Sequence, residues 1–493
     1  MLAGLTRALR PTRRRFLETL DDPAAAQARV LLRLTQRLRR SDYGRHLRVR
    51  TPEDFLLRVP VVDYDTLSPW LDRQRAQEGA VLTDERILFY EKTSGSSGAA
   101  KYIPYTASLR RSFSRMFAAW AADLLAIGPR FHSGKMYMSV SPSFSHEPPT
   151  GHGRPVGMTD DRDYLDRWLR HVVSPFVVHD PLAARARDVE TFKRRTAALL
   201  AGARDLEIIS VWSPSFLKLL LDEIAARHGS DDWQRLWPRL KLISCWASAS
   251  AAPQARALAQ LMPTVMVQGK GLLATEAPIT VPIIAARAPM PLVDEVLLEL
   301  EDDDGRLVPI YDGVRGREYG IVVSQSGGLY RYRMHDRVVV APPYRETPGL
   351  EFVGRAGGVS DLCGEKLHER FVSGALDGLL PDAFLRTLVP VREPRDHYVL
   401  VVDRFTGNAA ALAAALDERL RAAHHYHHAR ELGQLAPPRV CIARDAAALL
   451  TGAFADRGMK LGDIKPRALH TGPVDGALHA RLTVERTHGR LSA

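Results

Sequence analysis

Short runs rich in β-branched and aromatic residues alternate with helical patterns between residues 80 and 340, and this alternation constrains the fold most strongly. The runs lie at 135–140, 207–212, 240–245 and 264–268. Helix-like segments at 215–227 and 253–261 lie between or after them. Such alternation is typical of a parallel sheet covered by helices, so we predict a layered α/β architecture.

Three other regions differ from this pattern. Residues 1–60 carry apolar positions at helical spacing among arginines, which predicts a helical entry region. The stretch 295–340 reads as consecutive strands with Gly-rich turns, which predicts an antiparallel β subdomain. After a Gly-rich stretch comes a short α+β pattern: a strand at 397–402, a helix at 409–428, a strand at 439–443 and a helix at 446–454.

These regions predict a division of the chain into a large and a small domain. We expect a large nucleotide- and acid-binding domain over residues 1–354, a hinge over 355–364 and a small mobile C-terminal domain over 365–493. A chain of 493 residues is long enough for two or three domains.

Composition narrows the class of protein. Apolar residues make up 45% and charged residues 25%, no apolar run approaches the roughly 18 residues of a membrane span, and the N-terminus lacks the apolar core of a secretory signal. Three scattered cysteines favour a reducing compartment, so we expect a cytoplasmic protein. The net charge of +11 comes from arginines dispersed among acids, without a nucleic-acid module. We therefore expect neither nucleic acid nor membrane as a partner, and the sequence carries no signal for oligomeric state.

The segment Thr93–Lys101 reads Thr-Ser-Gly-Ser-Ser-Gly-Ala-Ala-Lys and lies between two strand-like runs, 87–90 and 102–105. Its glycines let backbone N–H groups turn toward an anion, while its hydroxyls and Lys101 add donors and positive charge. It is not a Walker loop, because Tyr102 follows the lysine where that loop has Ser or Thr. The segment predicts a phosphate-binding loop, with a flexible Ser/Gly linker as the alternative.

Four more segments supply residue types that nucleotide chemistry uses. They are Gly271–Glu276, Leu329–Asp336, Gly354-Arg355 with Gly364–Glu369, and Lys460–Arg467. Taken singly, Glu276 could be a surface acid, Asp336 could form an ion pair with Arg333 or Arg337, and Lys465 could be an ordinary loop lysine. The prediction depends on all five segments occurring in this order.

In this order the five segments resemble those of adenylate-forming enzymes (the firefly luciferase and acyl ligase-like group). Within that group they resemble the Gretchen Hagen 3 (auxin-responsive promoter) family of acyl acid-amido synthetases, over nearly the whole chain. The resemblance implies an ATP-dependent ligase that adenylates a small carboxylic acid, releases pyrophosphate and transfers the acyl group to an amine, with an amino acid as the expected acceptor. Two alternatives stay open: a ligase that forms an acyl thioester, and a nucleotide-binding or regulatory protein that has lost catalysis.

The resemblance also implies roles for individual residues, with ATP and Mg²⁺ as cofactors. The phosphates would be held by Thr93, Ser94, Gly95, Ser96, Ser97, Gly98 and Lys101. Glu276 would bind Mg²⁺ and Thr275 could donate to the α-phosphate. Asp336 would accept from the ribose hydroxyls, assisted by Arg355. Lys465 would stabilise charge on the reacting carboxylate and the α-phosphate.

Three positions depart from the family pattern. Leu272-Leu273 stands where a tyrosine-glycine pair is common, so adenine would need another wall, for which Trp246 is a candidate unless it is simply buried. His335 replaces a glycine beside the proposed ribose-binding aspartate. Asp463 replaces a glutamine near Lys465. The last two departures motivate the alternative of lost catalysis.

The remaining candidates have ordinary structural interpretations. Trp212, Phe216 and Met138 could line an acid pocket or belong to the core. The run His424–His428 suggests a metal site, but a structural or surface role is favoured because no metalloprotease pattern accompanies it. Ser96 and Ser97 lack a Gly-x-Ser-x-Gly context, so a hydrolase is rejected.

Overall fold

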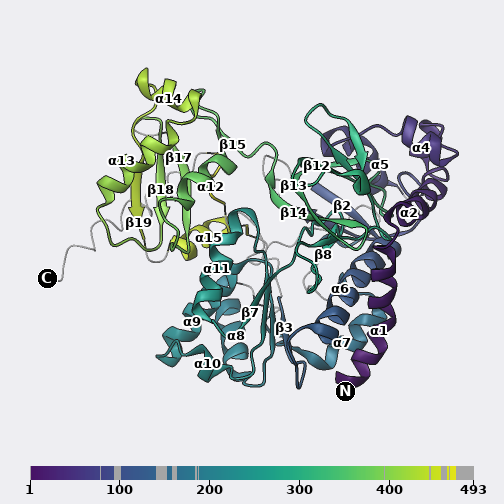
Figure 1. Cartoon of the computed structure of the whole chain (residues 1–493), viewed down its shortest axis with the longest axis horizontal. Helices are drawn as coiled ribbons and strands as arrows, with labels where there is room; N and C mark the ends of the chain where they lie inside the picture. Colours follow the sequence, from purple (N-terminus) through teal and green to yellow (C-terminus); the bar gives the residue numbers. More distant parts are fainter. Residues whose placement is uncertain are drawn as a thin grey trace.

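The computed structural model describes residues 2–77, 79–93, 101–139, 153–157, 164–183, 186, 188–392, 395–443, 446–456, 464–465 and 467–472. Three lobes are visible in Figure 1: a parallel sheet with its helices, an antiparallel sheet beside the N-terminal helices, and a C-terminal α+β lobe. The predicted α/β architecture is confirmed.

The parallel sheet has the strand order β4-β3-β5-β6-β7, and every neighbouring pair in it is parallel. Its strands are β3 (Met136–Met138), β4 (Val177–Val178), β5 (Ile208–Ser210), β6 (Leu242–Cys245) and β7 (Met266–Gly269). They are shorter than the predicted runs, because the flanking residues of each run turn into the connections. Parallel strands end at one edge of the sheet, which is where ligands bind in such folds.

Alternate residues of these strands belong to two different cores, as the period of two requires. Ile208 and Leu242 pack in the core that contains α6 (Ala107–Ile127). Ile209 and Ile243 pack in the core that contains α8 (Val189–Gly202), α9 (Pro214–His228) and α11 (Ala252–Leu261). The sheet is therefore covered on both faces, which explains why its strands read as continuous apolar runs. The short helices α7 (Arg167–Val173) and α10 (Trp233–Leu236) complete this lobe.

The predicted antiparallel subdomain is a five-stranded sheet in the order β11-β10-β12-β13-β14. Its strands are β10 (Leu297–Glu301), β11 (Leu307–Pro309), β12 (Glu318–Ser324), β13 (Tyr332–Tyr344) and β14 (Thr347–Arg355). Two short pairs lie nearby: β1 (Ile87–Thr93) with β2 (Lys101–Thr106), and β8 (Thr280–Val281) with β9 (Met290–Pro291).

Four helices lie in the predicted N-terminal entry region, residues 1–60, and a fifth follows it directly. They are α1 (Leu2–Thr19), α2 (Pro23–Leu38), α3 (Asp42–His46), α4 (Pro52–Arg58) and α5 (Tyr64–Ala76). Helix α2 begins after Asp22, whose carboxylate accepts from the Ala25 N–H, and has Pro23 at its first position. The buried amide of Gln27 on α2 donates to the Val293 and Val296 carbonyls at 2.7 and 2.8 Å. This side chain fastens α2 to the start of the antiparallel sheet.

The C-terminal lobe consists of β15 (Val359–Ser360), β16 (Leu367–His368), α12 (Glu369–Asp377), β17 (Arg386–Val391), β18 (His397–Val402), α13 (Ala409–Leu420), α14 (His424–Glu431), β19 (Arg439–Ile442) and α15 (Ala446–Asp456). The prediction of one helix over 409–428 is wrong: the chain turns at 421–423, and Asp417 pairs with both Arg421 and Arg430 across that turn. The predicted strands and the last helix are confirmed within one or two residues.

The C-terminal sheet also contributes to two cores. Leu388 and Leu400 pack with α12 and α13, whereas Val389 and Val401 join the core of α8 and α9. Before this sheet, the buried carboxylate of Glu365, directly after the predicted hinge, accepts from the Leu362 and Cys363 N–H groups of the hinge at 2.8 and 2.9 Å. The domain limits and rotation about 355–364 stay predictions.

Within the part of the chain that the structure describes, no helix is both long and apolar enough to cross a membrane.

Candidate active site

The hairpin β1–β2 carries the predicted phosphate loop at its tip. Thr93 pairs with Lys101 in the last register position of the hairpin, so the two ends of the loop lie side by side. The Lys101 ammonium lies 5.4 Å from the centroid of the Tyr64 ring, and the Tyr64 hydroxyl accepts from the Tyr102 N–H at 2.9 Å. The predicted residues Ser94, Gly95, Ser96, Ser97 and Gly98 lie outside the described residues.

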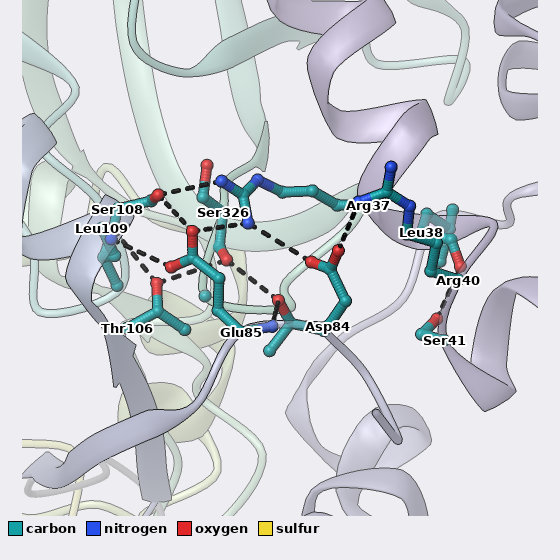
Figure 2. Close-up of polar contacts among 12 residues, drawn as sticks. Arg37, Leu38, Arg40, Ser41, Asp84, Glu85, Thr106, Ser108, Leu109 and Ser326 are labelled. Atoms are coloured by element: carbon teal, nitrogen blue, oxygen red, sulfur yellow. Dashed lines mark hydrogen bonds and ion pairs between the residues drawn. The ribbon is translucent and has the colours of Figure 1, made fainter. Parts of the chain in front are cut away.

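The base of this hairpin is fastened by the polar network in Figure 2. Arg37 of α2 contacts Asp84 at 3.3 Å and Glu85 at 2.5 Å, directly before β1. Its other terminal nitrogen donates to the Ser108 hydroxyl at 3.0 Å, directly after β2, and Glu85 accepts from the Ser108 N–H at 3.0 Å. Burial alone would raise the pKa of Glu85, but the Ser108 hydrogen bonds and the Arg37 charge lower it. A charged carboxylate therefore joins both ends of the hairpin to α2.

The same network reaches the loop that follows β12. The hydroxyls of Thr83 and Thr106 donate to the Ser326 carbonyl at 3.3 and 3.4 Å. Thr106 also caps α6 by accepting from the Leu109 N–H at 3.2 Å. The hairpin is thus held at its base by both α2 and the loop that follows β12.

Thr275 and Glu276 lie at the tip of a second tight turn. Ala274 and Ala277 exchange backbone hydrogen bonds at 3.2 Å, which leaves Thr275 and Glu276 as the two residues between them. The turn starts at Gly271, where φ is +74° and a Cβ would lie 2.4 Å from the Thr280 hydroxyl, so only glycine fits. The Tyr105 hydroxyl of β2 donates to the Thr275 carbonyl at 2.6 Å and links this turn to the first hairpin.

Asp336 occupies a bulge in β13. Residues 334–336 of β13 oppose only Ile321 of β12, because the register shifts between Gly320 and Val322, and His335 has a φ of +60°. Bulges of this kind redirect side chains and are frequent near active sites. Asp336 is buried and pairs with Arg355 of β14, whose Nε lies 3.2 Å from its carboxylate. Arg355 also donates to the Met334 carbonyl at 3.0 Å, so the arginine holds the bulge in place.

Four charged side chains among the predicted site residues influence the pKa of Asp336. Burial raises the pKa of Asp336, the positive charges of Arg355, Lys465 and Lys101 oppose that rise, and the negative charge of Glu276 adds to it. These groups come from β14, the C-terminal segment, β2 and the 271–280 turn. Residues separated by more than 350 positions in the sequence therefore share one electrostatic environment.

Lys465 reaches this place from a segment that adds to the C-terminal sheet. Leu388 of β17 donates to the Ala468 carbonyl at 2.8 Å and accepts from the His470 N–H at 2.9 Å. The carboxylate of Glu369, at the start of α12, accepts from the Ala468 N–H at 3.0 Å. The Lys465 ammonium lies 5.5 Å from the centroid of the Trp246 ring. Asp463 lies outside the described residues.

Aromatic side chains surround the ends of the parallel strands. Trp212 follows β5 and Trp246 follows β6, with their ring centroids 6.2 Å apart, and Tyr164 lies 6.3 Å from Trp212. Trp246 is only half-buried, as a ligand-facing wall requires, whereas Cys245 is fully buried. Phe216 stacks on Phe192 inside the core, so of the predicted pocket residues Trp212 has the clearest place beside the site.

Sequence reasoning missed Tyr105, Trp120 and Lys270. Tyr105 links two site turns, and Lys270 lies over the rings of both Trp120 and Trp212. Tyr105 lies in the strand-like run 102–105 that follows the phosphate loop, and Lys270 directly precedes the Gly271–Glu276 segment. For these two residues, the position next to a motif is the sequence signal that could have identified them.

Two other predicted features have ordinary surroundings. Burial lowers the pKa of His335, with Arg355 and Lys101 adding to the effect, so its imidazole is mainly neutral at pH 7. His427 contacts Glu431 at 3.1 Å on α14, and His424 lies 6.5 Å from His428 between ring centroids. Among the described residues, no three His, Cys, Asp or Glu side chains gather as a metal site of their own.

A separate cavity of 510 Å³ lies beside the base of β1, lined among others by Arg75, Glu85, Tyr90 and Arg154. None of the predicted site residues lines this cavity, so the candidate site remains the cluster around Asp336.

Three family models match this chain in sequence order. They are the GH3 family N-terminal domain at residues 12–220, the GH3 family central domain at 295–355 and the GH3 family C-terminal domain at 383–472. The chain belongs to the GH3 family. GH3 is the Gretchen Hagen 3 family, so the resemblance inferred from the five segments is confirmed.

Curated relatives are found in rice, Oryza sativa subsp. japonica. The "Probable indole-3-acetic acid-amido synthetase GH3.1" is 27% identical over 316 residues, which is 55% of this chain and 49% of that protein. The rice protein of the same description called GH3.2 is 23% identical over 434 residues, or 72% of this chain and 69% of that protein. The match therefore spans about half the length of the first of these relatives.

Solved structures share the fold. The AtGH3.15 acyl acid amido synthetase in complex with 2,4-DB superposes with a TM-score of 0.81 at 19% identity, covering 96% of both chains. A 2-hydroxyisobutyryl-CoA ligase in its postadenylation state superposes with a TM-score of 0.58 at 16% identity, covering 89% of this chain and 94% of that one. The fold is thus that of GH3 proteins and, more distantly, of an adenylate-forming CoA ligase.

Proposed function

We propose that this protein is an ATP-dependent acyl acid-amido synthetase. One observation carries the proposal: Arg355, which pairs with the buried Asp336 at 3.2 Å, and Lys465, Glu276 and Lys101, from three further segments, all act on the charge of Asp336. Activation of a carboxylate by ATP brings two anions together, and this mixture of fixed cations and carboxylates matches what that reaction needs.

In the first half-reaction, a carboxylate oxygen of the acid attacks the α-phosphorus of ATP. The bond from the α-phosphorus to the bridging oxygen breaks, and pyrophosphate leaves with that electron pair. Lys101 and the loop from Thr93 through Ser94, Gly95, Ser96, Ser97 and Gly98 would hold the β- and γ-phosphates, Thr275 would donate to the α-phosphate, and Lys465 would stabilise the charge that develops there. Asp336 and Arg355 would fix the ribose, because a carboxylate can accept from both sugar hydroxyls.

Mg²⁺ fits the donor set as a phosphate-bound ion. Glu276 would supply one carboxylate ligand, because Mg²⁺ prefers carboxylate and phosphate oxygens. When bound, the ion would neutralise part of the negative charge of the phosphates.

In the second half-reaction, the nitrogen of an amine attacks the acyl carbon of the adenylate. The bond from that carbon to the phosphate oxygen breaks, AMP leaves, and the nitrogen releases a proton to solvent. The rice relatives are named as amido synthetases of indole-3-acetic acid, which supports an amino acid as acceptor and an aromatic acid as one substrate class. A cytoplasmic location is proposed with this activity, since ATP is supplied there and the three cysteines carry free thiols.

The test is an incubation with ATP, Mg²⁺ and a panel of aromatic and aliphatic acids, with hydroxylamine as a trap for the adenylate. We expect acyl hydroxamate from at least one acid, and an amide of the predicted mass when amino acids replace hydroxylamine. A thioester formed only with coenzyme A would favour the rival ligase. ATP binding without hydroxamate from any acid would favour a protein that has lost catalysis.

A further inference from the structure

Lys270 is a buried lysine with no role in the mechanism above. It follows β7 directly, at the same sheet edge at which Trp212 follows β5 and Trp246 follows β6. Its backbone N–H donates to the Cys245 carbonyl at 3.0 Å, which continues the β6–β7 pairing by one residue. Three neighbouring strands thus deliver two indoles and one ammonium group to the edge where ligands bind in parallel sheets.

The Lys270 side chain is 7% exposed and lies among aromatic rings. Its ammonium is 5.0 Å from the centroid of Trp212 and 5.8 Å from that of Trp120, within the range of cation–π attraction. It also donates to the Ser210 hydroxyl at 2.7 Å. These contacts stabilise a cation away from bulk water, where its attraction for an anion is stronger than at the surface.

Two lysines occupy the two ends of one chain of aromatic contacts. Lys465 lies over Trp246, Trp246 packs against Trp212, and Trp212 lies under Lys270. Lys465 is the end that shares the electrostatic environment of Asp336 and Glu276. An acid whose body lay along the two indoles would have its reacting carboxylate on the Lys465 side and its far end on the Lys270 side.

We propose that Lys270 binds a second anionic group of the acyl acid, so that the preferred substrates are dicarboxylic acids activated at one carboxylate only. This rests on the proposed function for the reacting end and adds the substrate class. The indoles provide the apolar surface for the body of the acid, and Lys270 provides the charge that distinguishes a diacid from a monoacid of the same shape.

The test compares matched pairs: phenylacetate with 4-carboxyphenylacetate, and hexanoate with adipate. The variants are Lys270→Met, which removes the charge at similar volume, Lys270→Arg, which keeps it, and Lys241→Met as a control at the opposite end of β6. KM and kcat are measured by pyrophosphate release, and acid binding is measured separately by quenching of tryptophan fluorescence.

We expect the wild type to have the lower KM for the diacid of at least one pair. Lys270→Met should raise the diacid-to-monoacid KM ratio of that pair about 30-fold or more, the usual effect of removing one partner of a buried charge pair. Lys270→Arg should restore part of the ratio, and Lys241→Met should not change it.

An equal loss for both members of a pair would overturn the proposal, because Lys270 would then be structural or would hold the reacting carboxylate. So would a wild type that binds monoacids and diacids alike. If no acid releases pyrophosphate, the proposed function fails, and the fluorescence titration still decides: diacid binding that is lost in Lys270→Met supports the inference, and absent diacid binding refutes it.

Discussion

Asp336 and Lys465 are assigned to the same nucleotide, yet the molecule holds them in opposite ways. Asp336 is buried in a bulge of a 13-residue strand that pairs on both sides and is locked by Arg355. Lys465 is exposed and depends on a few backbone contacts around Ala468. Under the proposed function, the antiparallel sheet would supply recognition of the nucleotide, whereas the group that assists the chemistry would come from a separate segment. Binding and catalysis should therefore be separable by mutation.

The largest expected effect is the loss of catalysis when the exposed Lys465 is replaced. Lys465→Ala should lower kcat for adenylation about 100- to 1,000-fold, the usual loss when one preorganised charge at a reacting group is removed. ATP affinity, measured by calorimetry, should stay within about threefold because the sheet is untouched. An equal loss in both quantities would mean that Lys465 holds the nucleotide rather than the reacting atoms.

The next largest effect is the loss of ATP affinity when the buried Asp336 is replaced. Asp336→Asn should raise the Kd for ATP about 10- to 100-fold, since hydrogen bonds to a charged acceptor contribute roughly 1.5–3 kcal/mol. The control is ATP without its ribose 2′-hydroxyl, which should bind the wild type more weakly but lose little further affinity in the variant. If the loss of affinity from Asp336→Asn and the loss from the missing 2′-hydroxyl add up, Asp336 does not bind the ribose.

A smaller effect is expected where the Lys465 segment is fastened. Glu369→Gln keeps an acceptor for the Ala468 N–H but removes the charge, so we expect kcat to fall about 3- to 10-fold with ATP affinity unchanged. Glu418→Gln, an exposed acid on α13, is the matched control. If ATP affinity changes instead, the segment supports the nucleotide site directly.

The smallest effect concerns stability. Burial raises the pKa of Asp336, so the native state binds a proton more tightly than the unfolded chain there, and this contribution to stability is lost as pH rises through the raised pKa. The Tm of Asp336→Asn minus that of the wild type should increase from about pH 4 upward and then level off. A difference that falls with pH would mean that Arg355 determines the charge state.

The sequence predicted the parts of the site that lie within continuous motifs. The motifs predict Glu276, Asp336 and Lys465 as site residues, and apolar periodicity predicts the parallel and antiparallel sheets that the structure contains. It could not predict the bulge that turns Asp336 inward, because a register shift depends on the partner strand. Nor could it find Lys270 beside Trp212, since 58 positions separate them in the chain and only the strand order unites them. Helix propensity likewise does not encode the break at 421–423, across which Asp417 pairs with Arg430.

Exchange of labelled pyrophosphate into ATP, dependent on a carboxylic acid, tests most directly whether these segments form one adenylating site. We expect acid-dependent exchange in the wild type, exchange at reduced ATP affinity in Asp336→Asn, and a loss of at least about 100-fold in Lys465→Ala. A wild type that binds ATP but shows no exchange with any acid, or a Lys465→Ala variant that exchanges at the wild-type rate, would contradict this assignment.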